Sequence, residues 1–505
     1  MKSIRNKRQI FNCLGGAIVV LWLVMIGLLI KKSYFQKSEK PVEISSKTTT
    51  VNEARRDWME IYLRDSKVGY SMIQINPMGD DYLIWEEIVL NLNLMGQASV
   101  MRTTIRSVVD HGFRLKRFTL QMDSGVVRFQ VSGKVEGLRM HIETGQGTRK
   151  KTRTIALTAP PVTGTGISQF FRGRPLKAGE SFNFLMFDPS TLARKSVVVT
   201  VVGKESIVIK RIKYHTFRLE TEMWGQELIF WVDEAGEVLK ETGFMGFTLI
   251  RSSAAAAPRD LTGETSDDFY EMASIDVTPK LRHADRLTYL KMRVEGLENA
   301  HFDAGALVSE RQRLVGDTLE IIQEKRPLKA GYMLPLPDVT DELNPYLSPG
   351  FNIQSDDTAI VDTAREIVGD LRNPVAAARK LMAWVYAHVE KKPVLSVPSA
   401  VEVLKTKTGD CNEHAVLLTA LLRAAGIPAR ECVGLVYAND RFFYHAWTEA
   451  YIGRWVSMDA TLNQMPTDAT HIKLVQGGLE RQTDIIALIG KLRLKILNYE
   501  YDRTD

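Results

Sequence analysis

Cysteine is scarce in this chain of 505 residues, which has three: Cys13, Cys411 and Cys432. So few cysteines exclude a disulfide framework, and only a bridge between Cys411 and Cys432 is left open. The sequence also lacks the regularly spaced acidic ligands of a calcium loop and the histidine spacing of a metal site. We therefore expect no metal and no other cofactor.

The body of the chain lacks an excess of positive charge, although the formal net charge is +6. Residues 1–40 hold eight Lys or Arg and one acid, which leaves 58 basic (66 − 8) and 59 acidic (60 − 1) side chains for the rest. A nucleic-acid groove needs its basic residues on a folded surface, so we expect no nucleic-acid partner.

The amino-terminal segment carries the excess charge and one long apolar run. Residues 10–30 span roughly 30 Å as a helix, the thickness of the bilayer core, and the basic residues 1–9 precede them. The positive-inside rule then predicts a cytoplasmic tail, a membrane anchor at residues 10–30, a linker at residues 31–53 and a periplasmic or other extracytoplasmic body. A cleaved signal peptide is the alternative, but the run ends in Leu-Leu-Ile-Lys-Lys without small residues for cleavage.

With 45% hydrophobic and 25% charged residues, the chain has globular composition and room for two or three domains. Residues 54–252 contain alternating, β-branched runs separated by Gly and Asp turns, which predicts a large antiparallel β domain. Residues 253–350 suggest a strand-rich bridge, and residues 476–505 form a carboxy-terminal extension. Thr163-Gly164-Thr165-Gly166 lacks the Lys of a phosphate loop, so we expect a flexible loop there.

Helical periodicity begins near Ser355 and marks a third region, residues 351–475. The sequence predicts a helix capped by Ser355 or Asp356, a second that restarts at Asn373-Pro374, and a third with Ser399 and Glu402 as a capping box. Residues 411–425 then form a run that is apolar on nearly all sides and ends at Gly426, as expected for a buried helix.

Cys411 falls in the first turn of that buried helix. Unpaired amides and the helix dipole favour an anion at this end, which predicts a thiol pKa lowered toward the reactive thiolate. Free cysteine is also a common core residue, so the thiol needs partners before it indicates chemistry.

His445 and Asp459 follow on two segments with strand character. His445 can act as the base that deprotonates Cys411, and the Asp459 carboxylate can orient the imidazole. If Tyr451-Ile452-Gly453 is a hairpin loop, then 445 and 459 are cross-strand partners on one face. A two-residue turn would move Asp459 to the other face, where it would only cap the strand.

The stretches GDCNEHAVLLTALLRAAGIPAR and YHAWTEAYIGRWVSMDAT together resemble the core of the transglutaminase-like superfamily. The resemblance implies an α+β fold: a papain- and transglutaminase-like core with a buried helix on an antiparallel sheet, preceded here by the β domain and one transmembrane helix. It implies Cys411 as nucleophile, His445 as general base and acid, and Asp459 as the orienting carboxylate. With its membrane anchor and its β-rich segment before the core, this chain is similar to anchored extracytoplasmic bacterial proteins of the superfamily.

Other residues near the motif have structural alternatives. His414 competes with His445 for the base role, while Glu413, Trp447 and Glu449 could line the site or belong to the core. Trp447 and Glu449 share the strand face of His445 if the strand is regular. Cys432 reads as a core cysteine.

The predicted activity is acyl transfer to or from protein or peptide amides through a thioester. An amine acceptor makes the enzyme a transglutaminase, whereas water makes it an amidase or cysteine peptidase. The backbone amide of Cys411 is the expected oxyanion donor. A binding or scaffold module that retains the fold without turnover is the alternative, and the oligomeric state is left open.

Overall fold

The computed structural model describes residues 51–502, except 126–127, 145–150, 262–267, 300–303, 338, 395–398 and 478–483. The expected tail, membrane anchor and most of the linker therefore lie outside the described residues, as does Cys13. Among the described residues, no helix combines the length and the apolar character that crossing a membrane requires.

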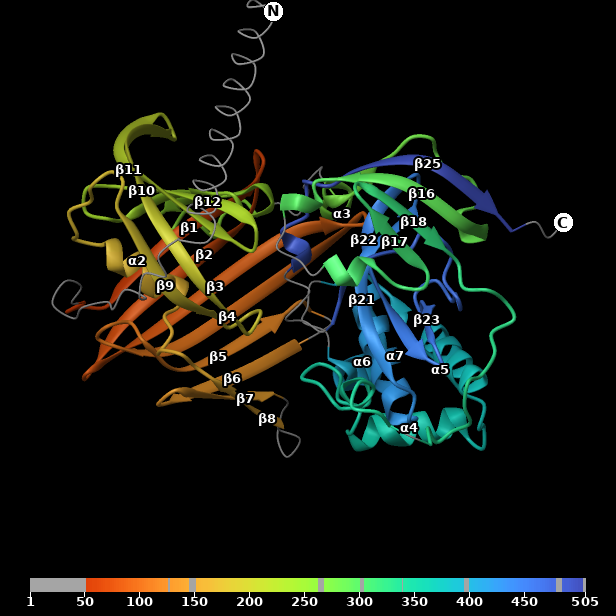
Figure 1. The fold of residues 1–505 in the computed structure, drawn as a ribbon. Helices are drawn as coiled ribbons and strands as arrows, with labels where there is room; N and C mark the ends of the chain where they lie inside the picture. The colour runs from red at the N-terminus through yellow and green to blue at the C-terminus, as the bar shows by residue number, and fades with distance from the viewer. Residues whose placement is uncertain are drawn as a thin grey trace, which may run out of the picture. The chain divides into compact units, whose positions relative to one another are not determined.

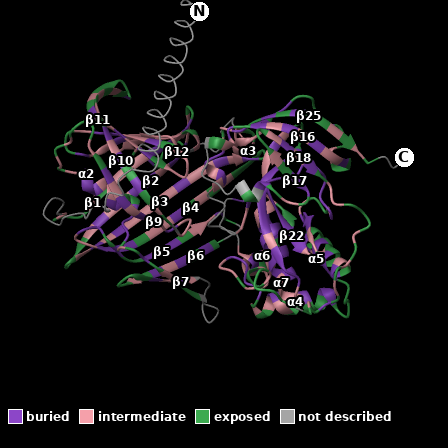
Figure 2. Ribbon diagram, in the orientation of Figure 1, coloured by how far each residue is buried: buried purple, intermediate pink, exposed green. Residues whose placement is uncertain are grey.

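The amino-terminal half of the described chain is one antiparallel sheet of fourteen strands, ordered β8-β7-β6-β5-β4-β3-β2-β1-β14-β13-β12-β11-β10-β9. The strands β3 (Asp81–Leu94) and β4 (Gln97–Asp110) form the longest hairpin, joined by Met95 and Gly96, which both have positive φ as a tight hairpin turn requires. Figure 1 shows the strands of this sheet in red to yellow-green, and Figure 2 shows buried positions along them alternating with intermediate or exposed ones. The predicted large antiparallel β domain is confirmed.

The other strands of this sheet are β1 (Arg55–Leu63), β2 (Ser66–Met78), β5 (Leu115–Asp123), β6 (Arg128–Glu136), β7 (Arg139–Thr144), β8 (Lys151–Ala156), β9 (Ser181–Asp188), β10 (Ala193–Ile209), β11 (Ile212–Met223), β12 (Gln226–Val232), β13 (Val238–Thr242) and β14 (Phe247–Ser252).

The prediction of a flexible loop at Thr163–Gly166 is wrong, because this stretch caps and begins the helix α2 (Gly164–Phe171). Thr163 is the N-cap, and its side chain accepts a hydrogen bond from the Gly166 amide. Phe170 and Phe171 at the other end are buried against neighbouring aromatic rings. Burial of two aromatic side chains outweighs the low helix propensity of the glycines.

The carboxy-terminal region contains a second sheet, in which the strands run β15-β22-β21-β24 and β23 pairs with β22. Helix α7 (Cys411–Ala424) packs on this sheet and is buried along most of its length, as predicted. Three further helices share its apolar cluster: α4 (Thr358–Val368), α5 (Pro374–His388) and α6 (Ala400–Thr406). The strands are β15 (Ile275–Asp276), β21 (Ala429–Ala438), β22 (Arg441–Tyr451), β23 (Trp455–Met458) and β24 (Ile472–Gln476), and β19 (Glu390–Lys391) pairs with β20 (Thr408–Gly409) nearby.

The helix caps agree with the sequence in part. Asn373 caps α5 as expected, since its side chain accepts the amides of Val375 and Ala376. Helix α4 is capped by Asp357, not by Ser355 or Asp356, because helical geometry begins only at Thr358. Ser399 is the N-cap residue of α6 but makes no side-chain cap, so the predicted capping box is absent there.

The bridge and the carboxy-terminal extension form one sheet, with strand order β17-β18-β16-β25. Its strands are β16 (Leu287–Glu295), β17 (Gln312–Val315), β18 (Thr318–Ile322) and β25 (Arg493–Tyr501). Leu290, Met292 and Ile496 of this sheet belong to the same apolar cluster as Leu435 and Phe442 of the second sheet. Residues on either side of the predicted core therefore complete its hydrophobic interior.

Short helices complete the described chain: α3 (Phe269–Ala273) and the 3₁₀ helices η2 (Phe244–Gly246), η3 (Ala284–Arg286), η4 (Leu297–Asn299), η5 (Ala304–Leu307) and η6 (Asn344–Tyr346).

Candidate active site

Cys411 is the first residue of α7, and a capping box fixes the turn that precedes it. The Asp410 side chain accepts the Asn412 amide at 2.9 Å and the Glu413 amide, while Glu413 accepts the Asp410 amide at 2.9 Å. Gly409 is required here, because a Cβ at this position would lie 2.2 Å from the Cβ of Glu413. The box uses the amides of Asn412 and Glu413 and leaves that of Cys411 to other partners.

The residue Cys411 is partly exposed, and its thiol accepts a hydrogen bond from the Ala446 amide of β22, next to His445 in the chain. Burial by the surrounding protein raises the pKa of the thiol well above its usual value, and the Asp410 carboxylate raises it further, whereas the Ala446 amide lowers it. The predicted lowering of this pKa is therefore wrong. The capping carboxylates Asp410 and Glu413 offset the favourable end of the helix dipole.

His445 and Asp459 form a buried hydrogen-bonded pair. The Nε2 atom of His445 lies 2.7 Å from Oδ2 of Asp459, and since a carboxylate only accepts, Nε2 carries the proton. The other ring nitrogen, Nδ1, is then the one left to accept a proton from a thiol. Between the two side chains of Cys411 and His445, no direct hydrogen bond is recorded among the described residues.

The hairpin that carries this pair has a different register from the predicted one. Its loop is Ile452-Gly453-Arg454, with Tyr451 opposite Trp455 and Thr448 opposite Met458. Asp459 is thus not the direct partner of His445, as we had expected. The rings of Tyr451 and Trp455 pack 5.6 Å apart, which keeps Tyr451 in the strand and out of the loop. The shift is an even number of residues, so Asp459 stays on the face of His445.

Asp459 is held by more than His445. Its Oδ1 accepts the amides of Thr461 and Leu462 at 2.6 and 3.1 Å, and its Oδ2 also lies 3.1 Å from Nε2 of His471. Burial alone would raise the pKa of the Asp459 carboxyl, but the two histidines hold it far below its usual range. The carboxylate is therefore ionised across the physiological range.

Sequence reasoning missed His471 and Asp468, which complete this cluster. Nδ1 of His471 lies 3.2 Å from Oδ1 of Asp468, and both side chains are buried. Both residues lie in or next to an irregular loop, where hydrophobic periodicity gives no signal. A histidine three residues after an aspartate was the only visible hint.

Tyr270 was missed for a different reason, because it lies 140 positions before its partner. It comes from α3, and its hydroxyl donates to Oδ2 of Asp410 at 2.8 Å. Tyr270 therefore supports the turn that precedes Cys411.

Four neighbours of the motif have defined places. His414 is buried and its Nδ1 donates to the Asp410 carbonyl at 2.7 Å, while burial lowers its pKa. Glu413 is the capping residue described above. Trp447 lies on the face of His445, with ring centroids 6.4 Å apart.

Glu449 shares that face and forms ion pairs with Lys473 at 2.9 Å and Arg430 at 2.6 Å. Burial alone would raise its pKa, but these two cations hold it at about 2. Glu449 is therefore part of a buried ion-pair network.

Cys432 is fully buried in β21, as we expected for a core cysteine. Burial raises its pKa well above the usual range, and the Glu449 carboxylate adds to this effect. Cys411 and Cys432 are both free thiols in this structure.

The ligand atoms of His445, Asp459 and His471 lie within 4.8 Å of one another, a spacing that could hold a metal ion. The hydrogen bonds argue for a different use. Both ring nitrogens of His471 face carboxylates, so both carry protons, whereas a metal ligand must offer a lone pair. We therefore describe these side chains as a hydrogen-bonded cluster.

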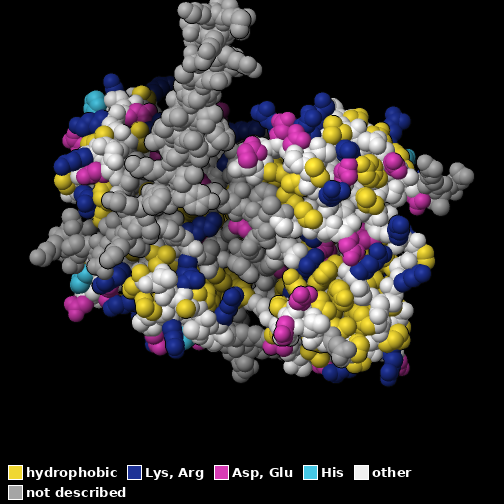
Figure 3. Space-filling model, viewed as in Figure 1, with side chains coloured by type: hydrophobic (Ala, Val, Ile, Leu, Met, Phe, Trp, Pro, Cys, Tyr) yellow, Lys and Arg dark blue, Asp and Glu magenta, His cyan; other side chains and the backbone are white. Residues whose placement is uncertain are grey.

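A cleft of about 1160 Å³ lies beside the turn that follows Asp459. Asn463 and Met465 form part of its wall, together with the cations Arg326, Arg379 and Lys380. Neither Cys411 nor His445 lines it, so the chemistry is not assigned there. On the face shown in Figure 3, Lys and Arg side chains of the described residues are interspersed with acidic and hydrophobic ones.

Two family models match the sequence. Residues 361–460 match the Transglutaminase-like superfamily, and residues 75–246 match a family described as Protein of unknown function (DUF3108). The first range contains Cys411, His445 and Asp459, and it ends before Asp468 and His471. No curated protein matches the sequence.

Solved structures give weaker likenesses. A candidate cysteine protease from Cytophaga hutchinsonii is 22% identical, with 43% of this chain and 89% of that chain covered and a TM-score of 0.30. A candidate protease from Parabacteroides distasonis is 10% identical, with 68% and 69% covered and a TM-score of 0.19. A protein of a domain family of unknown function from Brucella abortus is 14% identical, with 40% and 96% covered and a TM-score of 0.30. At such TM-scores these likenesses carry no argument.

The family match and the α+β core, with a buried helix that begins at a cysteine beside a His–Asp pair, lead to the same conclusion. Residues 361–460 belong to the transglutaminase-like superfamily, and in this chain that core follows a large antiparallel sheet.

Proposed function

We propose that this protein is a cysteine acyl-transfer enzyme in which Cys411, His445 and Asp459 act as a triad on protein or peptide amides. The observation that carries the proposal is the buried 2.7 Å contact between His445 Nε2 and Asp459 Oδ2, together with the hydrogen bond that the Cys411 thiol accepts from the amide of Ala446, the residue after His445. That contact fixes the tautomer in which Nδ1 is free to act as a base.

The first step starts from a neutral thiol, because the pKa of Cys411 is raised. His445 takes the thiol proton through Nδ1 while the sulfur attacks the amide carbonyl. The C–N bond then breaks, the imidazolium of His445 gives its proton to the leaving amine, and a thioester on Cys411 is left. Asp459 stabilises the imidazolium, and in this proposal the Cys411 amide donates to the oxyanion.

The second step releases the acyl group. His445 deprotonates an incoming amine or water, which attacks the thioester. His445 then gives this proton to the sulfur as the C–S bond breaks. With an amine the enzyme is a transglutaminase, and with water it is an amidase or cysteine peptidase. The residues of the triad serve both acceptors equally.

The raised pKa of Cys411 favours one further candidate, a binding or scaffold module without turnover. Incubation of the protein with a glutamine-containing protein and a tagged amine separates these candidates. Incorporation that is lost in Cys411→Ala and kept in Cys432→Ala supports a transglutaminase. Cleavage or ammonia release without incorporation supports hydrolysis, and neither product from a folded protein supports the scaffold.

We also propose that residues 10–30 anchor the protein in a membrane, with the body outside the cytoplasm. The support is the length of the apolar run and the basic residues before it. Cell fractionation tests the anchor, and protease protection in intact spheroplasts tests the orientation. Recovery of the full chain in the high-salt-extractable fraction would contradict it.

A further inference from the structure

His471 occupies an unusual position beside the proposed triad. It is fully buried, yet each ring nitrogen faces a carboxylate: Nε2 lies 3.1 Å from Asp459 Oδ2, and Nδ1 lies 3.2 Å from Asp468 Oδ1. Carboxylates only accept, so both nitrogens donate and the ring is an imidazolium. Burial opposes this charge, but the two carboxylates raise the pKa of His471 to about 9.

Asp468 is held firmly in place. Its Oδ1 accepts the amide and the hydroxyl of Thr470 at 2.8 and 2.6 Å, and its Oδ2 accepts Nε2 of Gln464 at 2.9 Å. The Gln464 side chain also accepts the Asp468 amide at 3.0 Å. A carboxylate with this many partners cannot turn away from His471 without losing several hydrogen bonds.

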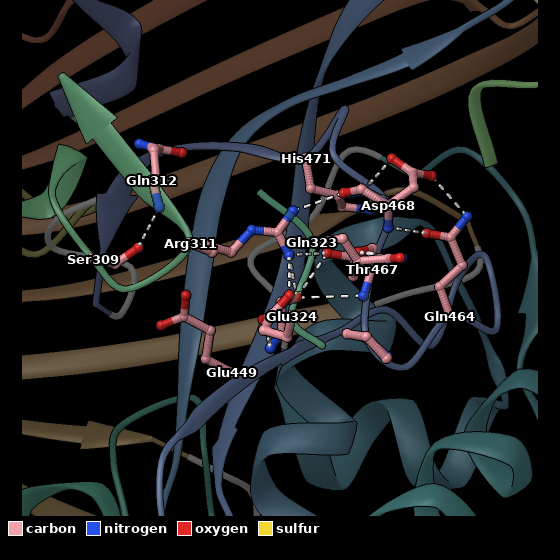
Figure 4. A network of polar contacts seen from close by, with 12 residues as sticks. Ser309, Arg311, Gln312, Gln323, Glu324, Glu449, Gln464, Thr467, Asp468 and His471 are labelled. Carbon is pink, nitrogen blue, oxygen red and sulfur yellow. Dashed lines mark hydrogen bonds and ion pairs between the residues drawn. The ribbon is translucent and has the colours of Figure 1, made fainter. Parts of the chain in front are cut away.

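Arg311 ties this loop to the segment before β17. Its guanidinium donates to the Asp468 carbonyl and to Thr467 Oγ1, both at 2.7 Å, and pairs with Glu324 at 2.9 Å. Figure 4 shows Arg311 between Glu324 and the Thr467–Asp468 backbone, with His471 beyond. The loop that supports His471 is thus fixed by residues outside the range of the family match.

We propose that His471 is a positioning residue for the triad. Its Nδ1 is anchored to Asp468, and its Nε2 binds Asp459 Oδ2, the same oxygen that His445 contacts. This inference rests on the proposed function, because it assigns His471 a role in a reaction carried by Cys411. The positive charge of His471 partly neutralises the Asp459 carboxylate. Asp459 can therefore orient the His445 ring without over-stabilising the protonated form of His445.

Every charged or titratable group near the cluster enters this balance. Among the described residues these groups are Cys411, Glu413 and His414 of α7, its N-cap Asp410, Tyr270 of α3, His445 and Glu449 of β22, Lys473 of β24, Asp459, Asp468, and Arg311 at the Asp468 carbonyl. His471 is the cation in this set that contacts Asp459 without belonging to the triad.

The test follows alkylation of Cys411 by iodoacetamide in the full chain, from about pH 5 to about pH 9, with peptide mass spectrometry. In wild type, the rate falls on the acid side, where the triad no longer removes the thiol proton. In His471→Gln, the Asp459 carboxylate loses its second cationic partner, so its negative charge stabilises the protonated form of His445 more strongly. The acid limb then moves to higher pH by about one unit. His471→Asn, a shorter neutral variant, shifts it in the same direction.

Lys473→Gln is the matched control. It removes a buried cation two positions away, whose recorded ion pair is with Glu449 and not with Asp459, so the acid limb stays where it is. An unchanged limb in folded His471→Gln or folded His471→Asn would overturn the inference. Absence of any acid limb in wild type would instead count against the proposed triad, so the two failures are distinguishable.

Discussion

His445 and Asp459 lie 2.7 Å apart at Nε2 and Oδ2, although they are not cross-strand partners in their hairpin. Strand pairing places Asp459 one diagonal step from His445, and the carboxylate reaches back along the shared face. Two backbone amides and His471 hold Asp459 in that orientation. The pair is therefore fixed by contacts of the following loop as much as by the hairpin.

Asp459→Asn is expected to lower kcat/KM about 10²- to 10⁴-fold, because an amide cannot fix the tautomer of His445 or stabilise its cation. Assay of amine incorporation or hydrolysis measures the effect. Asp362→Asn is the control, since it removes a carboxylate from a largely exposed ion pair on α4. A change of less than about threefold in Asp459→Asn would contradict the assigned role.

Iodoacetamide should label Cys411 and spare Cys432 in the folded protein. Cys411 is partly exposed, whereas Cys432 is fully buried and has a strongly raised pKa. Without His445 the Cys411 thiol has no base, so in His445→Ala the rate at neutral pH should fall and recover only well above pH 9, since its thiol pKa is raised. Equal labelling of both cysteines in folded protein would contradict this expectation.

Gly409→Ala is expected to destabilise the protein by about 1 to 3 kcal/mol, because the new Cβ would collide with the Glu413 side chain. Movement of Glu413 would also break its hydrogen bond to the Asp410 amide. Gly350→Ala is the control, since the nearest atom to its Cβ would be 3.7 Å away. Urea unfolding measures both, and equal midpoints would show that the capping turn tolerates the methyl group.

The stability of the wild-type protein should fall as pH rises from about 6.5 to about 9, and part of this fall belongs to His471. Its pKa is raised to about 9 in the folded state, so its contribution is complete below the unfolded value and disappears as pH passes the folded one. The contribution is roughly 3 kcal/mol.

Urea unfolding of wild type and His471→Gln at both ends of this range tests the expectation. The difference between the two proteins should shrink at the alkaline end, while the Cys411 thiol is common to both and cancels. A difference that stays constant with pH would mean that His471 is neutral in the folded protein.

The sequence by itself determined which stretches become strands and helices in most of the described chain. Alternation of apolar residues specified the large sheet, and the apolar run after Cys411 specified a buried helix that ends before Gly426. These features depend on local periodicity, which is visible in a single sequence. The shared face of His445 and Asp459 depended in addition on a three-residue loop between the strands, which the sequence alone left open.

Tertiary structure decided what depends on distant residues. The pKa of Cys411 follows from burial and from Asp410, which outweigh the helix end. Tyr270, Arg311 and the Asp468–His471 pair reach the site from loops and from segments far away in the chain. Loop residues carry no periodicity, and desolvation and Coulomb interactions depend on distances in space, so only the folded chain fixes these parts of the site.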